Sequence, residues 1–183
     1  MLWYTGTTEN RNGVGILINK SLKYGVVDIK RCGDRIILDK LVVGDLVLNV
    51  ISVYDPQVGH NENTKRGFLE GLEGMVRSVP TGEKLFIGGD LNGHVATSST
   101  GFEGVHGGFS YGIMNQEGED VLSFALAYDM NIANTLFKKR ESHLVTFSSG
   151  QHSSQIDFDL SRREDRRACL DCKVIPRDCC PST

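Results

Sequence analysis

The chain has 183 residues, of which 39% are hydrophobic and 23% charged, and its formal net charge is −3. This composition is typical of a folded domain with a sizeable core, and it excludes wholesale disorder. The negative charge argues against binding nucleic acid through overall charge alone. No apolar run approaches the ~20 residues of a membrane-spanning helix. Met1–Tyr4 lacks the layout of a secretory signal. We therefore expect an intracellular protein that does not contact membranes.

The first half of the chain contains short apolar runs that predict β-strands. The runs cover residues 13–19, 24–29, 35–43 and 46–54. Gly33-Asp34 and Gly44-Asp45 separate them as tight turns, which indicates an antiparallel meander. The first run is expected to be a buried strand. Leu46–Tyr54 is almost continuously apolar, as expected for a central strand covered on both faces.

An amphipathic helix should follow, because apolar residues recur at helical spacing from Phe68 to Val79. Asn63 or Thr64 can cap its start, and Pro80 ends it. The remaining expected elements are a buried strand at 84–88, a second helix through 121–128, and short strands at 131–133, 144–147 and 155–160. The long glycine-rich stretch at 93–118 is expected to be functional surface. This order predicts sheet layers flanked by helices, in a single domain.

The strongest candidate site is the segment Gly88-Gly-Asp-Leu-Asn-Gly-His94. Asp90 follows an apolar strand, so its carboxylate should emerge at the rim of the sheet. Asn92 lies two residues further on, and residues at that spacing on an extended chain point the same way. Together the two side chains could hold a hard cation, position a water or bind a phosphate oxygen. The alternative is an ordinary turn at the end of a strand.

Two further segments place polar groups at the ends of strands. Tyr54, in Val53-Tyr-Asp-Pro56, can offer its hydroxyl to a phosphate or can pack as an aromatic at the rim. Asp157 is flanked by Ile156 and Phe158, and a carboxylate there is costly unless it is paired or bound to a cation.

Basic clusters and cysteines leave alternatives open. Lys138–Arg140 and Arg162–Arg167 are either phosphate-binding patches or solvated surface charges. The odd number of cysteines argues against a disulfide scaffold. The four cysteines within residues 169–180 could bind zinc, but adjacent cysteines rarely ligate one ion together, and free thiols are the simpler interpretation.

The order and spacing of these segments resemble the endonuclease/exonuclease/phosphatase superfamily, which includes apurinic endonucleases and deoxyribonuclease I. The similarity is greatest to endonuclease domains of non-LTR retrotransposons and to craniofacial development protein 2-like proteins. The matching segments are Trp3-Tyr-Thr-Gly, Asn12-Gly-Val-Gly-Ile-Leu, Val50-Ile-Ser-Val-Tyr54-Asp-Pro56-Gln, Gly89-Asp-Leu-Asn-Gly-His94, Leu144-Val-Thr-Phe, Ser154-Gln-Ile-Asp-Phe158 and Arg162-Arg-Glu-Asp. The resemblance implies an α+β fold, a four-layer α/β/β/α sandwich, with Mg²⁺- or Mn²⁺-dependent cleavage of phosphodiesters in DNA.

By motif match, the resemblance implies a role for each candidate residue. Asp90 would activate the attacking water or contact the metal, and Asn92 would hold the scissile phosphate or the cation. Tyr54 would hydrogen-bond the phosphate, and Asp157 would orient the family's catalytic histidine. Additional contacts to the substrate would come from Thr146 and Ser154.

The resemblance also implies that part of the family's site lies outside these 183 residues. The family's metal-binding Glu belongs before Trp3 and its closing His after Pro176, and none of the five histidines matches that position. We therefore expect a domain over residues 1–176 that is truncated at both ends, a disordered tail at 177–183, and weak or no activity. Departures from the family pattern at Asp55, Met114 and Asp159 point the same way, although Asp159 could be a replacement ligand.

Three alternatives to a DNA-cleaving domain stay open. The domain could be a non-catalytic remnant that still binds nucleic acid, a phosphatase acting on a small phosphoester, or a zinc-binding module built on the terminal cysteines. We expect a monomer, and a nuclear location if the chain derives from a retroelement.

Overall fold

The computed structural model describes residues 1–6, 12–57, 59 and 61–176. The chain forms two compact units, Met1–Leu91 and Asn92–Thr183, and each is described by itself. Both units combine strands with helices, so the predicted α+β class is confirmed. The predicted tail at 177–183, with Cys179 and Cys180, lies outside the described residues. Among the helices that are described, none is long and apolar enough to cross a membrane.

The first unit is built on a mixed sheet with the strand order β3-β4-β5-β6. Strands β3 (Val26–Cys32), β4 (Ile36–Val43) and β5 (Leu46–Tyr54) are antiparallel neighbours, while β6 (Lys84–Asp90) runs parallel to β5. The predicted antiparallel meander is therefore confirmed for β3, β4 and β5, while the first predicted run lies outside it. Gly33 (φ 57°) and Gly44 (φ 59°) supply the left-handed backbone of its two turns.

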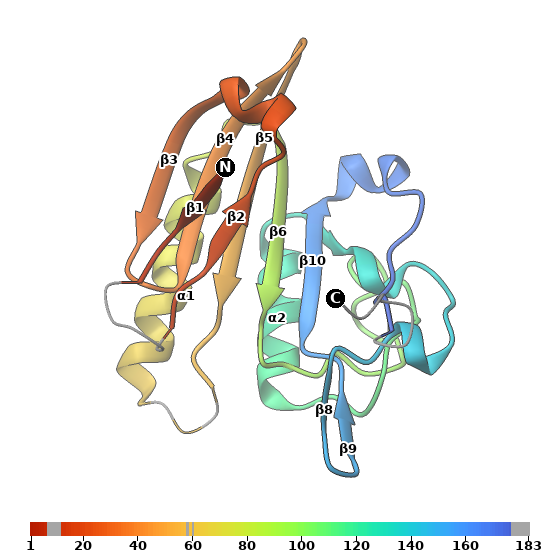
Figure 1. Ribbon diagram of the computed structural model, residues 1–183. Coiled ribbons are helices and arrows are strands. Elements are labelled where there is room, and N and C mark those ends of the chain that lie inside the picture. Colours follow the sequence, from red (N-terminus) through yellow and green to blue (C-terminus); the bar gives the residue numbers. More distant parts are fainter. Residues whose placement is uncertain (7–11, 58, 60, 177–183) are drawn as a thin grey trace. The chain divides into compact units, whose positions relative to one another are not determined.

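The first two strands form a short ribbon of their own. β1 (Leu2–Tyr4) pairs with β2 (Gly15–Leu17) and lies over the sheet on the side away from the helix (Figure 1). A 3₁₀ turn, η1 (Lys20–Gly25), then leads into β3. The predicted buried strand at 13–19 was wrong in length and burial. Only residues 15–17 are extended in the sheet, and Leu17 is 79% exposed because the outer face of this ribbon has no covering element among the described residues.

Helix α1 (Glu62–Arg77) connects β5 to β6 and covers one face of the sheet (Figure 1). Its buried side chains are Leu72, Met75 and Val76. Asn61 caps its start, since the Asn61 side-chain oxygen accepts from the backbone N–H of Thr64 at 2.8 Å. The predicted cap, Asn63 or Thr64, was therefore placed two or three residues too late.

Strand β5 lies centrally between β4 and β6, as predicted, but its two faces differ. Asn49, Ile51 and Val53 are fully buried on the helix side, whereas Val50 and Ser52 on the other side are only partly buried. Strand β5 was expected to be covered on both faces, but its cover is complete only on the helix side. The buried hydrophobic core of this side continues through Ile36, Leu38, Leu85 and Ile87.

The second unit contains helix α2 (Gln116–Ala127) and an antiparallel pair formed by β7 (Met130–Ile132) and β10 (Asp157–Arg162). A small hairpin joins β8 (Phe147–Ser149) to β9 (His152–Ser154). Three 3₁₀ turns complete the unit, namely η2 (Ala133–Thr135), η3 (Glu141–His143) and η4 (Arg163–Ala168).

Two predictions for this half of the chain need correction, and one strand was not predicted. The predicted strand at 144–147 begins only at Phe147, because the Val145 N–H bonds back to the Glu141 carbonyl and continues the η3 turn. Strand β9 had not been predicted, since its sequence is polar throughout. The predicted long surface stretch ends at Asn115, because the last residues assigned to it, including Gly118, form the first turn of α2.

Candidate functional site

Asp90 ends strand β6 directly beside Tyr54, the last residue of β5. The two are register partners in the parallel pair. The backbone N–H of Asp55 donates to the Asp90 carbonyl at 2.8 Å, which continues the pairing one residue beyond β5. Both side chains are half-buried. The structure therefore brings together two of the predicted site residues at the carboxyl ends of β5 and β6.

Gly89 makes this alignment possible. Its φ is +149°, and a Cβ at this position would lie 1.9 Å from the Val53 carbonyl oxygen. A larger residue would push β6 away from β5 just before Asp90. The glycine before the aspartate is thus required by close strand packing, quite apart from any chemistry at the aspartate.

The Tyr54 side chain is held from two sides. The Gln57 side-chain amide donates to the Tyr54 hydroxyl at 3.1 Å. The guanidinium carbon of Arg35 lies 5.0 Å from the centroid of the Tyr54 ring, within range of a cation–π interaction. Neither Gln57 nor Arg35 was predicted from the sequence. Gln57 stands within the matched Val50–Gln57 segment, which was the one available signal for it.

Asn92 does not lie on an extended chain, so the argument that aligned it with Asp90 was wrong. Strand β6 ends at Asp90, and Asn92 adopts a left-handed backbone with φ 49°. Asparagine tolerates this conformation better than most residues. The role predicted for the Asn92 side chain stays a prediction.

The backbone after Asn92 is fixed against the start of α2 by Asn115. The Asn115 side-chain oxygen accepts from the His94 N–H at 2.8 Å and from the Gly118 N–H at 2.9 Å, so it caps the helix and holds the loop at once. A Cβ on Gly118 would lie 1.8 Å from the His94 carbonyl oxygen, which shows how closely the two segments pack. Asn115 is a structural residue that was not predicted from the sequence.

Thr146, Ser154 and Asp157 form a second group of predicted residues. The Thr146 hydroxyl oxygen accepts from the N–H groups of Ile156 at 3.0 Å and Asp157 at 3.2 Å. The Thr146 N–H donates to the Ser154 carbonyl at 2.9 Å. Thr146 therefore fixes the backbone from which the Asp157 side chain emerges at the start of β10.

A second carboxylate, Asp159, follows two residues later on the same strand. Its N–H donates to the side-chain oxygen of Asn134 at 2.7 Å, and its Oδ2 accepts from the Cys172 thiol at 3.7 Å. Although the residue as a whole is exposed, burial of its carboxyl group away from solvent raises the pKa of Asp159. The hydrogen bond from Cys172 opposes this rise, and the charge of Asp157 adds to it. Burial, followed by the charge of Asp159, raises the pKa of Cys172 to about 12, so this thiol stays protonated at neutral pH.

The predicted residues are divided between the two units. Asp90 and Tyr54 belong to the first, while Asn92, Thr146, Ser154 and Asp157 belong to the second. Within the described parts of the chain, no group of three or more His, Cys, Asp or Glu side chains is arranged to hold a metal. The predicted ligands Asp90 and Asn92 offer one carboxylate and one amide oxygen. That oxygen donor set suits Mg²⁺ or Mn²⁺, which retain several waters and bind substrate phosphate.

Some residues of the basic clusters form ion pairs, whereas the cysteines that the structure describes are free. Cys32, Cys169 and Cys172 are free thiols. Lys139 forms an ion pair with Asp171, and Arg163 pairs with Asp129 at 3.0 Å. Arg166 and Arg167, in η4, are exposed.

Comparison with known proteins supports the resemblance. No family model matches the chain. It is 29% identical over 184 residues to craniofacial development protein 2 of Bos taurus, covering 99% of this chain and 31% of that protein. The same protein of Tragulus javanicus is also 29% identical, with 99% of this chain and 32% of that protein covered. The chain thus spans about a third of the length of these relatives.

Solved structures share the fold at low sequence identity. The endonuclease domain of TRAS1, a telomere-specific non-LTR retrotransposon, superposes with a TM-score of 0.59 at 12% identity, covering 90% of this chain and 67% of that one. TDP2 of D. rerio, complexed with single strand DNA product, gives 0.58 at 11% identity, with 88% and 61% covered. The chain is therefore similar to craniofacial development protein 2 along its whole length, and it shares the α+β fold of the TRAS1 endonuclease domain and of TDP2.

Proposed function

We propose that this chain is a phosphodiesterase domain that cleaves DNA with the help of Mg²⁺ or Mn²⁺. The observation that supports it most is the alignment of Asp90 with Tyr54 at the carboxyl end of two parallel strands. A carboxylate beside a phenolic hydroxyl offers one group that takes a proton from water and one that donates to a phosphate oxygen. The fold shared with the TRAS1 endonuclease domain and TDP2 agrees with this chemistry.

Each residue has a defined part in the proposed reaction. Asp90 orients and deprotonates the attacking water, and Tyr54 donates its hydroxyl to a non-bridging oxygen of the phosphate. Asn92 holds the scissile phosphate or the cation through its side-chain amide. A bound divalent cation would supply a Lewis acid that offsets charge at the phosphate. The proposed substrate contacts of the second unit are Thr146 and Ser154, and the role proposed for Asp157 is to orient a catalytic histidine.

The proposal is tested by the nicking of supercoiled plasmid DNA with and without Mg²⁺ or Mn²⁺. Asp90→Asn keeps the size of the side chain but removes the base, and loss of such a group typically lowers the rate 10²–10⁴-fold. The matched control is Asp45→Asn, which neutralises an exposed carboxylate in the β4–β5 turn. Cleavage that is metal-independent, or equal in both variants, would refute the proposal.

The same assay measures how active the chain is. Weak nicking that disappears in Asp90→Asn agrees with the expectation of impaired activity, whereas robust nicking contradicts that expectation and supports the function itself. Parallel incubation with a sugar phosphate distinguishes the phosphatase alternative. A phosphatase would release phosphate from the sugar and leave the plasmid intact.

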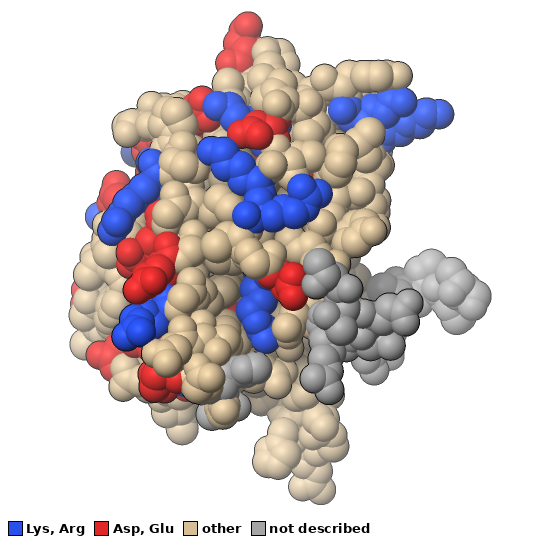
Figure 2. All heavy atoms as spheres, turned by 90° about the vertical axis from the view of Figure 1, so that its left-hand side faces the viewer, with Lys and Arg blue, Asp and Glu red and all other residues tan. Residues whose placement is uncertain are grey.

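A second candidate function, DNA binding without cleavage, is favoured by the exposed arginines of η4, Arg166 and Arg167. Figure 2 shows basic side chains interspersed with acidic ones on the face that it presents. Salt-sensitive binding that Arg166→Gln and Arg167→Gln weaken, without metal-dependent nicking, would establish this alternative. A nuclear location and a monomeric state remain part of the proposal, and fluorescence microscopy and light scattering test them.

A further inference from the structure

Arg35 lies at the end of the turn between β3 and β4, at the same edge of the first unit as Tyr54. The Tyr54 N–H donates to the Arg35 carbonyl at 3.0 Å. In return, Nη1 of Arg35 donates to the Tyr54 carbonyl at 3.2 Å. Backbone and side chain of Arg35 therefore both bond to Tyr54, at the residue where β5 ends.

The guanidinium group is fixed by two further contacts. Nη2 of Arg35 donates to the side-chain oxygen of Asn12 at 2.7 Å. The guanidinium carbon lies over the Tyr54 ring, 5.0 Å from its centroid. A long side chain held in one place by two hydrogen bonds and an aromatic face needs little further ordering when it meets a ligand.

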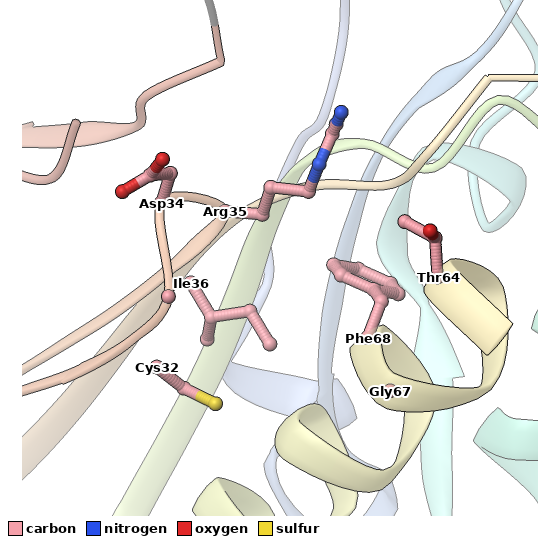
Figure 3. Close-up of a pocket in the computed structure, with 8 residues that line it drawn as sticks. Cys32, Asp34, Arg35, Ile36, Thr64, Gly67 and Phe68 are labelled. Atoms are coloured by element: carbon pink, nitrogen blue, oxygen red, sulfur yellow. The ribbon is translucent and has the colours of Figure 1, made fainter. Parts of the chain in front are cut away.

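Arg35 is a cation without a carboxylate partner among the residues that the structure describes, although several other basic residues have one. Lys40 pairs with Glu83 at 2.7 Å, and Arg163 pairs with Asp129 at 3.0 Å. Figure 3 shows Arg35 extending from the start of β4 while the carboxylate of the neighbouring Asp34 points elsewhere. Its positive charge is therefore available to an anion beside Tyr54 and Asp90.

We infer that Arg35 is a phosphate-binding residue of the candidate site, where it acts together with the Tyr54 hydroxyl. This inference rests on the proposed function only in taking a phosphodiester as the ligand. Guanidinium groups match phosphate oxygens in geometry, and N–H donors of Arg35 beyond the two used by Tyr54 and Asn12 can make such bonds. Tyr54 alone would offer a neutral donor, and Arg35 adds the charge that a phosphodiester requires.

The competing explanation is that Arg35 only ties the Asn12 segment to the end of β5. In that case Arg35→Gln would lower the unfolding temperature, but it would leave phosphate binding unchanged in the variant that remains folded. Arg35→Lys separates the two roles, because it keeps the charge while losing the paired bonds to Asn12 and Tyr54.

The direct test is an NMR titration of the whole chain with inorganic phosphate. The Arg35 side-chain Nε–Hε signal is assigned by its loss in Arg35→Lys. A saturable shift of this signal and of the Asp55 amide is expected, with no shift at Arg77, an exposed arginine that pairs with Glu73 on α1. Absence of a saturable shift at Arg35, or equal shifts at both arginines, would overturn the inference.

A second measurement uses fluorescence anisotropy with a labelled single-stranded DNA oligonucleotide over a range of salt concentrations. Arg35→Gln should weaken binding several-fold and reduce the salt slope by about 0.7, the value for one phosphate contact on a single strand. Arg35→Lys should retain most of the slope, and Arg77→Gln should match the unaltered chain. An unchanged slope in Arg35→Gln would overturn the inference.

The two proposals fail separately. If Asp90→Asn leaves nicking unchanged while phosphate still saturates at Arg35, the proposed cleavage fails and the Arg35 site stands. If nicking depends on Asp90 but Arg35→Gln changes neither the phosphate titration nor the DNA salt slope, the opposite holds.

Discussion

Tyr54 and Asp90 are register partners on two adjacent parallel strands, and each is the last residue of its strand. The alignment follows from the register of β5 and β6, from the hydrogen bond of Asp55 to the Asp90 carbonyl, and from the close approach of the strands at Gly89.

Replacing Gly89 by alanine should destabilise the chain by several kcal/mol. The added methyl group would lie 1.9 Å from the Val53 carbonyl oxygen, so one of the two strands must shift. The matched control is Gly74→Ala in α1, where nothing lies within 4 Å of the added carbon and a gain of up to about 1 kcal/mol is expected. Urea denaturation measures both. Equal stability of Gly89→Ala and the unaltered chain would show that the strands can separate freely.

A buried carboxyl group in β4 predicts an unusual pH dependence. Asp39 is fully buried, and neither of its oxygens has a hydrogen-bond partner within the part of the chain that the structure describes. Burial raises its pKa to about 6, against an attraction to Arg31 that lowers it. The folded chain therefore holds this proton more tightly than the unfolded chain, whose value is 3.8, and the contribution of Asp39 to stability falls as the pH rises from about 4 to about 6.

Asp39→Asn should accordingly stabilise the chain at pH 7.5 by up to about 3 kcal/mol, since each tenfold change in proton affinity corresponds to about 1.4 kcal/mol. At pH 4 the gain should nearly vanish, because aspartic acid is then neutral in the folded chain. Urea midpoints of both proteins at the two pH values provide the measurement. A stability difference between the two proteins that does not change with pH would contradict the raised pKa of the buried Asp39 carboxyl group.

Asn115→Ala should cost more stability than loss of an ordinary helix cap. Asn61 caps α1 by accepting from Thr64 alone, and its replacement by alanine should cost about 1 kcal/mol. Asn115 accepts from Gly118 and also from His94, so a cost of about 2–3 kcal/mol is expected. Faster hydrogen exchange at the His94 amide should accompany it. Equal costs for the two variants would mean that the bond to His94 contributes nothing.

Thr146→Val should lower the stability by about 1–3 kcal/mol, because the N–H groups of Ile156 and Asp157 lose their acceptor without a change in side-chain size. Thr146→Ser retains the oxygen and should cost less than about 1 kcal/mol. Amide chemical shifts of residues 156 and 157 should change in the valine variant only. If both variants behave alike, the hydroxyl does not organise the start of β10.

Regular strands were predicted well where turns bound them. Strand β5 was predicted with its observed ends, because Gly44-Asp45 precedes it and the apolar run stops at Tyr54. Strand β6 was predicted two residues too short, because a glycine pair suggests the end of a strand. It continues to Asp90 because Ser52, Val53 and Tyr54 supply pairing partners, and such partners come from the tertiary fold.

The site was harder to predict, for two physical reasons. The positive φ of Asn92 is a local property of that residue. The expectation that Asp90 and Asn92 point the same way assumed an extended chain there. Arg35 stands within a short turn sequence, Gly33-Asp-Arg, and nothing local indicates that its guanidinium meets the aromatic ring at the end of another strand. Residue types and strand ends were predictable, while side-chain partners across strands were not.

The crossover through α1 has a consequence for how this part of the molecule is made. Tyr54 and Asp90 lie on opposite sides of the whole helix in the sequence, so their pairing closes a long loop and should follow the local hairpins of β3, β4 and β5 during folding. Arg35, Tyr54 and Asp90 nevertheless all belong to Met1–Leu91. These three residues and the strands that carry them are therefore synthesised before any residue of the second unit.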